Sequence, residues 1–379
     1  MPLPLCFQSA SRGAARRRRP NWRALVGAVL LGASVGVGAA TDLRLDNAND
    51  NDNDNDRTSA TDHATDCPPA PIDSAPALQI DSALGAPDRG FLWRIRKDGR
   101  DAYLYGTVHI GKAAWRTPGP RVAQALAASD TLALELDPLD PDVLRRLQLG
   151  VAARPERTLP AALAQRIERL ARAECLAPLA LSGVIPEIQI AALLGLQARR
   201  DGLYSTFGVD TLLARWGHAK RVMVVSLETP ELQLRAMQNL PPPPEPTSPT
   251  SPTAPAAPTA AAGPELHRSI AHALDAIETG RARPLLARIA QIWENGDLAG
   301  LQNYAAWCEC MDSAPQRAET RRSLDARNPA LADAIAALHA RGQHVFAAVG
   351  SLHLIGSLGL PALLAQRGFQ IERLSADAP

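Results

Sequence analysis

The sequence lacks the short motifs that define the common enzyme classes. It contains no His-Glu-x-x-His, no Gly-x-Ser-x-Gly, no phosphate-binding loop and no dinucleotide-binding fingerprint. It also lacks a long apolar run, because the N-terminal apolar stretch at residues 24–38 is shorter than the roughly 20 residues that a spanning helix needs. We therefore expect none of those enzyme classes and no transmembrane domain in the mature chain, with an uncleaved N-terminal membrane anchor as the alternative.

An excess of basic residues is absent as well. The formal net charge of the 379 residues is +1, and the first forty residues hold six arginines and no acidic residue. Without those six arginines the formal net charge is −5. Proteins that bind nucleic acid usually carry a basic patch or a high isoelectric point, so we expect no nucleic-acid partner.

The N-terminal ninety residues and one internal stretch differ in composition from the rest. Residues 1–40 combine a basic stretch, an apolar run and small residues, which is typical of a signal peptide and predicts a periplasmic or secreted protein. Residues 41–90 and 241–264 are rich in Asn, Asp, Pro or Ala and predict a disordered linker and a disordered Pro-rich insertion. The folded domain is expected over residues 91–378.

Four cysteines follow the predicted signal peptide. They are Cys67, Cys175, Cys308 and Cys310. An oxidising compartment permits disulfides among them, in a pairing that the sequence leaves open. The spacing of Cys308 and Cys310 does not match a zinc knuckle, so a structural disulfide or a buried thiol is the preferred interpretation.

The two ends of the expected domain repeat one order of elements. Strand-like residues 102–105, a turn, a helical stretch at 121–128 and a strand at 131–136 are matched by residues 345–349, a turn, 358–366 and 369–374. Strand, helix and strand form a βαβ unit with parallel strands. The fold class is therefore α/β, with a central sheet built from two βαβ units and a helical insertion between them.

The residues between the two units are mostly helical in pattern. One further strand is expected at residues 221–227. Apolar residues recur at helical spacing over residues 159–175, 187–200, 209–216, 270–278, 284–293 and 329–341.

Each unit carries a Gly-x-x-His turn after its first strand. The turns are Gly106-Thr107-Val108-His109 and Gly350-Ser351-Leu352-His353. Glycine permits a tight turn or a close approach, and the carboxyl ends of parallel strands are where open α/β sheets bind ligands. A single such histidine is more often structural, but two at equivalent positions predict a shared site.

Three charged residues are candidates for the same site. Glu135 ends the strand of the first unit, Glu228 ends the strand at 221–227, and each is a carboxylate ligand, a general base or simply a helix cap or ion pair. Arg327 is expected to pair with one of these carboxylates or to clamp a substrate group. Asn328 is a possible helix cap before Pro329, and His218, His267, His272, His339 and His344 are interpreted as surface residues.

Taken together, these motifs resemble the TraB/GumN family, which is similar to the TIKI metalloproteases and, more distantly, to erythromycin esterase and ChaN-like proteins. The resemblance covers about residues 90 to 378. It rests on residues 91–95 and 105–109, on Glu135, on Gly208-Val209-Asp210, on residues 227–229, on Arg327-Asn328, and on residues 349–354 and 367–369. Ser351-Leu352, bulkier than the family pattern, and the Pro-rich insertion depart from it.

The resemblance implies a metal-dependent hydrolytic site. His109, His353 and Glu135 would hold a divalent manganese, zinc or cobalt ion, which would activate water and polarise a peptide or ester carbonyl. Glu135 or Glu228 would take the proton, and Arg327 matches a recurrent polar position. Two alternatives remain open, namely a periplasmic protein that binds haem, a metal or a small ligand without turnover, and one that sequesters a peptide.

Overall fold

The structure, a computed structural model, describes residues 67, 77–238, 262–308, 311 and 314–374. The predicted signal peptide, nearly all of the predicted linker up to residue 76, and residues 241–261 of the predicted insertion lie outside the described residues. Within the described part, no helix combines the length and the apolar character needed to cross a bilayer.

Six strands form one mixed sheet in the order β4-β3-β5-β2-β1-β6. The strands are β1 (Phe91–Lys97), β2 (Arg100–Thr107), β3 (Thr131–Leu134), β4 (Met223–Ser226), β5 (Val345–Gly350) and β6 (Gln370–Arg373). Neighbouring strands from β4 to β2 are parallel, whereas β1 is antiparallel to both β2 and β6. The predicted α/β class with a central sheet is confirmed.

The two strands of each predicted unit are not paired with each other. β5 lies between β2 and β3, and it is parallel to both. β6 is separated from β5 by β2 and β1. The two units are therefore interleaved, and the C-terminal strand β5 is buried along its whole length at the centre of the sheet.

A tight hairpin joins β1 to β2. Asp98 and Gly99 are both in the left-handed region, with φ of 51° and 73°. Two successive left-handed residues form the turn that matches the twist of paired strands, and Asp-Gly is a favoured sequence for it. The sequence analysis did not predict this hairpin, although its signal is present.

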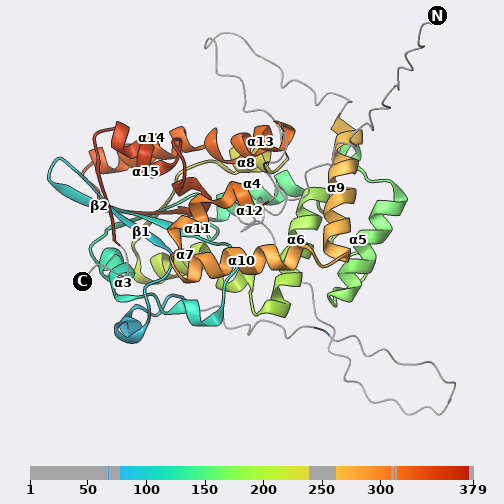
Figure 1. Cartoon of the computed structure of the whole chain (residues 1–379), viewed down its shortest axis with the longest axis horizontal. Helices are drawn as coiled ribbons and strands as arrows, with labels where there is room; N and C mark the ends of the chain where they lie inside the picture. Colours follow the sequence, from blue (N-terminus) through green and yellow to red (C-terminus); the bar gives the residue numbers. More distant parts are fainter. Residues whose placement is uncertain (1–66, 68–76, 239–261, 309–310, 312–313, 375–379) are drawn as a thin grey trace, which may run out of the picture.

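Helices cover both faces of the sheet. Figure 1 shows α14 and α15 over one face, α3, α7 and α10 over the other, and α5, α6 and α9 gathered beside the sheet. The helices are α3 (Pro120–Ala127), α4 (Pro141–Val151), α5 (Ala161–Ala173), α6 (Pro186–Ala198), α7 (Val209–Lys220), α8 (Pro230–Met237), α9 (Ala262–Glu278), α10 (Ala282–Glu294), α11 (Leu298–Gln302), α12 (Tyr304–Trp307), α13 (Ala314–Thr320), α14 (Asn328–Ala340) and α15 (Leu360–Gln366). Each helical stretch expected from the sequence is present, and α4, α8 and α11 to α13 are additional.

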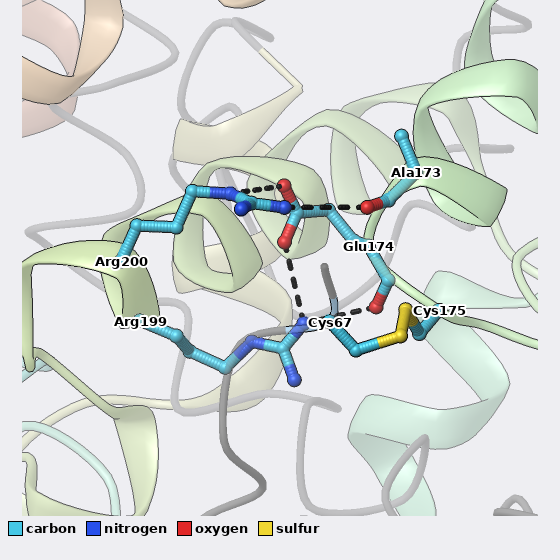
Figure 2. The surroundings of a disulfide bond; sticks show 6 residues. All are labelled: Cys67, Ala173, Glu174, Cys175, Arg199 and Arg200. Atoms are coloured by element: carbon cyan, nitrogen blue, oxygen red, sulfur yellow. Dashed lines mark hydrogen bonds and ion pairs between the residues drawn. A yellow bond between two sulfur atoms is a disulfide. The ribbon is translucent and has the colours of Figure 1, made fainter. Parts of the chain in front are cut away.

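A disulfide fastens Cys67 to Cys175, directly after α5 (Figure 2). Next to it, the buried carboxylate of Glu174 forms ion pairs with Arg199 and Arg200, with a nitrogen-to-oxygen distance of 3.3 Å in each. Cys67, which precedes the predicted domain in the sequence, is thus bonded covalently to the segment that follows α5. Cys308 is also disulfide-bonded, in agreement with a structural role rather than a metal-binding one.

Candidate active site at the carboxyl edge of the sheet

The two Gly-x-x-His turns lie side by side. In the parallel pairing of β2 with β5, Gly106 faces Val349 and Thr107 faces Gly350. The second turn continues as a short 3-10 helix, η7 (Ser351–Leu354), and the Ser351 hydroxyl donates to the Thr107 carbonyl at 2.8 Å. The expected convergence at the carboxyl ends of the strands is therefore seen in the geometry.

Gly106 lies where the two turns approach each other closely. A Cβ atom at this position would lie 2.7 Å from Leu354 Cδ1 and 2.9 Å from Ser351 Oγ. Real Cβ atoms do not come closer than about 3.0 Å to other atoms, so a side chain here would require Leu354 and Ser351 of the second turn to shift. Glycine at 106 lets the two histidine-bearing turns pack closely without that rearrangement.

His353 is fully buried and its ring orientation is set by Asn328. The Asn328 amide nitrogen donates to the Leu358 carbonyl at 2.7 Å, which leaves its oxygen to accept from His353 Nδ1. A ring that donates through Nδ1 presents a lone pair at Nε2. Among the described residues, Nε2 has no hydrogen-bond partner, and it lies 3.8 Å from Glu135 Oε1.

The role of Asn328 differs from the expected one. The residue that caps α14 is Arg327, and no side chain makes a capping hydrogen bond there. Asn328 is the first residue of the helix and its amide is directed at His353 instead. The helix-cap interpretation was wrong, because an Asn before a helix-starting proline has the same sequence signature whichever way its side chain points.

His109 is held by an acidic residue in a similar way. Its Nδ1 lies 3.1 Å from Oδ2 of Asp210, which is in the first turn of α7. Gly208 makes this possible, because a Cβ there would lie 2.4 Å from the His109 carbonyl oxygen. A carboxylate beside Nδ1 favours a proton on that nitrogen and a lone pair on Nε2.

Arg327 joins the two predicted carboxylates. Its Nη2 donates to Glu135 Oε2 at 2.7 Å and also contacts Glu228 Oε1, while its Nε donates to Glu228 Oε2 at 2.9 Å. The other Glu135 oxygen accepts from the Gly350 amide at 2.6 Å. All three charged side chains are less than 10% exposed. The two carboxylates thus share one cation.

A π-helix precedes Arg327. The segment η6 (Arg321–Asp325) is π-helical, and the Ser323 carbonyl within it accepts from Arg327 Nη1 at 3.1 Å. Single π turns inside α-helices occur frequently at functional sites. Here the π turn ends two residues before the arginine and supplies its guanidinium with a third partner besides the two glutamates.

The environment separates the pKa values of these groups. Burial alone would raise the pKa of Glu135, but His353, Arg327 and the Gly350 amide outweigh it and lower that pKa to about 2. Burial lowers the pKa of His353 to about 3, against the opposing effect of Glu135. Burial raises the pKa of Glu228, against the opposing effect of Arg327. At neutral pH the cluster therefore holds an ionised Glu135 and a neutral His353.

These residues have the types of donor atom that a divalent metal ion needs, but their positions suit a metal ion only in part. An ionised carboxylate and a neutral imidazole with a bare Nε2 are the forms that bind metals. The Glu135 and His353 donors already face each other. In the described part of the chain, however, no three His, Cys, Asp or Glu side chains are grouped closely enough to hold a metal.

One small cavity lies beside the turns in the described part of the chain. A cavity of about 10 Å³, enough for about one water molecule, is lined by Thr107 and Val108 of the first turn and by Ser351 and Leu352 of the second. Trp307 of α12 is among the apolar residues that close it. The side chains of both histidines and both glutamates are themselves buried, each less than 10% exposed.

Two of the histidines expected at the surface make specific contacts with other side chains. His339 is 1% exposed and packs edge-on against Phe369, so its interpretation as a surface residue was wrong. His218 is partly exposed and bonds to the buried Asp137 at 2.7 Å. Their hydrogen bonds among the described residues go to Asp137 and to the Arg100 carbonyl, which lie outside the cluster.

Asp210 is the site residue that sequence reasoning missed. It stands in the segment Gly208-Val209-Asp210, which belongs to the family-like pattern but does not by itself indicate a role for the aspartate. An acidic residue in the first turn of a helix is common for electrostatic reasons, so it carries no signal by itself. The glycine two residues earlier is the signal that could have marked it.

The model of one protein family, described as the TraB/PrgY/gumN family, matches residues 91–245 and 263–373. The match includes both Gly-x-x-His turns, both glutamates and Arg327. No curated protein and no solved structure shows a significant match.

Proposed function

Because the chain belongs to the TraB/PrgY/gumN family, we propose that the cluster around His109 and His353 is a hydrolytic site that uses a divalent metal ion. Peptide or ester bonds are the proposed substrates. Manganese, zinc and cobalt all suit mixed imidazole and carboxylate ligands.

One observation carries this proposal. A fully buried imidazole nitrogen, His353 Nε2, has no hydrogen-bond partner among the described residues and faces the Glu135 carboxylate. An unpartnered buried polar atom is costly, and such atoms cluster where a ligand belongs. We propose His353, Glu135 and His109 as the ligands, with Asn328 and Asp210 orienting the two rings.

The remaining charged groups have separate tasks. A bound divalent ion would supply a Lewis acid for the carbonyl and for a water molecule. Glu228 is the better proton acceptor of the two glutamates, because its pKa is raised by burial whereas that of Glu135 is lowered to about 2. Arg327 keeps both carboxylates in place.

A non-catalytic protein that binds a metal, haem or a peptide is the second candidate. The enclosure of the cluster favours it, because the cavity beside the turns has room for about one water molecule and not for a substrate. The Arg327 bonds to Glu135 and Glu228 favour it also, since they occupy the carboxylates that catalysis would use.

Metal content and hydrolysis separate the two candidates. Purified protein is analysed for metal, and a peptide library and ester substrates are digested with and without a chelator. His109→Ala and His353→Ala are compared with His344→Ala, an exposed histidine outside the cluster. If the site is a metal-dependent hydrolase, both cluster variants are expected to lose metal and activity, while the His344→Ala control keeps both. Wild-type metal content in both cluster variants would refute the metal site, and metal without any cleavage would favour the binding protein.

We also propose that the protein is exported to the periplasm or secreted. The signal-like residues 1–40 and the Cys67–Cys175 disulfide support this, because disulfides persist in oxidising compartments. Fractionation of expressing cells and N-terminal sequencing of the mature chain test it. Recovery of the uncleaved chain from the cytoplasm would contradict it.

A further inference from the structure

A larger pocket, of about 410 Å³, opens elsewhere on the carboxyl edge of the sheet. Its walls come from the residues just before β1, the start of α3, the loop between α10 and α11, and the end of β6. Gly90 in this wall donates to the Trp293 carbonyl at 2.9 Å, and the Trp293 indole donates to the Gly106 carbonyl at 2.7 Å. The pocket is therefore joined to the first Gly-x-x-His turn through one tryptophan, but none of its lining residues belongs to the buried cluster.

The lining of this pocket is strongly polar and unevenly charged. Its charged residues are Asp88, Arg89, Arg121, Asp297 and Arg373. Asp88 accepts from the Arg121 backbone amide at 3.0 Å and lies 3.7 Å from the Arg121 guanidinium. Asp297 caps α11 by accepting from the Gly300 amide. Both acidic side chains are thus engaged.

The two other arginines have no carboxylate partner within 4.0 Å among the described residues. Arg89 donates to the Thr117 carbonyl at 3.2 Å, and Arg373 donates to the Gly296 carbonyl at 2.7 Å. The carboxylate of Glu294, whose pKa Arg89 helps to lower, is already paired with Lys112. Each guanidinium has five N–H donors, so most donors of both groups remain for a ligand.

We propose that this pocket binds a small oxyanion, either a carboxylate or a phosphate group. Two guanidinium groups, each fixed by one bond to a backbone carbonyl, offer planar donor pairs that match both chemistries. The volume suits a small organic acid rather than a bare ion. This site stands apart from the proposed hydrolytic function, because it uses none of the same residues.

Titration of the full chain with two probes tests the site. Succinate and inorganic phosphate are each added while binding is followed by calorimetry and by the NMR signals of the arginine Nε–H groups, with succinamide as the uncharged control. We expect saturable binding of at least one anion and none of succinamide. Tighter binding of succinate than of phosphate would identify a carboxylate ligand, and tighter binding of phosphate would identify a phosphate ligand.

Charge-removing variants locate the binding. Arg89→Gln and Arg373→Gln are each expected to weaken binding at least about tenfold, the size of effect from losing about 1.4 kcal/mol. Arg341→Gln, which removes an exposed arginine at the end of α14, is expected to leave it unchanged. Arg373→Lys keeps the charge without the planar fork and should give an intermediate affinity.

Three results would overturn the proposal. They are no saturable binding of either anion at millimolar concentration, equal affinity in the wild type and both Gln variants, and equal weakening by Arg341→Gln, which would indicate unspecific surface charge. Unfolding curves of each variant confirm that a lost affinity is not a lost fold.

Discussion

Replacing Arg327 with methionine should destabilise the protein strongly at neutral pH. Methionine has a similar length but no charge, so Glu135 and Glu228 would remain buried next to each other without their shared cation. Removing one partner of a buried ion pair costs about 3–5 kcal/mol, because the remaining charge is left uncompensated. We expect the free energy of unfolding, measured in urea at pH 7, to fall by about that amount.

The pH dependence of this loss has a definite sign. In the wild type the pKa of Glu135 is lowered to about 2, so its stabilising contribution is present above its usual pKa and is lost as the pH falls toward 2. Without Arg327 the folded-state pKa of both carboxyl groups rises, and the variant takes up protons on acidification. The difference in stability between wild type and variant should therefore narrow from pH 7 to pH 4.

Two companion variants make the result interpretable. Arg321→Met removes an exposed arginine from the adjacent π-helix and should change stability by less than about 0.5 kcal/mol. Adding Glu228→Gln to Arg327→Met removes one uncompensated charge and should restore part of the loss. A cost below about 1 kcal/mol for Arg327→Met at pH 7, or a gap that widens on acidification, would refute the shared-cation account.

Three further predictions concern the same fold. Asn328→Leu leaves His353 Nδ1 and a backbone carbonyl without partners and should cost about 1–3 kcal/mol, seen as a lower melting temperature; an unchanged temperature would contradict the bond. The ring signals of His353 in NMR spectra should not titrate between pH 5 and 8, because burial lowers its pKa to about 3, and a midpoint near 6.5 would show an accessible ring. Replacing Cys67 and Cys175 with serine opens a loop that spans 108 residues and should lower the free energy of unfolding, measured in guanidinium chloride, by up to about 4.7 kcal/mol. Equal stability of the variant and the wild type would mean that the disulfide constrains the unfolded chain little.

Much of the fold could be predicted because its elements have local signatures. The apolar runs of β3 and β5 and the helical spacing of α5, α6 and α10 are visible in the sequence, as are the turns that follow β2 and β5. The order of the strands is not visible in this way. The placement of β5 between β2 and β3 depends on pairing between residues more than 200 positions apart, and no local pattern encodes it.

The candidate site was predictable where one residue type stood out from its surroundings. Glu135 and Glu228 are charged residues at the ends of apolar strands, and Arg327 was expected to pair with one of them. It bonds to both. Asp210 and Asn328 were missed or misassigned because acidic and amide residues at helix starts have an ordinary capping explanation, and only the tertiary contact to a histidine distinguishes the two roles.

The central position of β5 has a consequence for how the chain acquires its structure. During synthesis, β2 and β3 are complete long before β5 is made, so each has an unpaired edge until residues 345–350 have been added. Loops of this length close slowly, because their entropy is lost before the strand contacts are gained. The second Gly-x-x-His turn follows β5 directly and is therefore made equally late. Neither the finished sheet nor the paired-histidine site can form before β5 and the second turn have been synthesised.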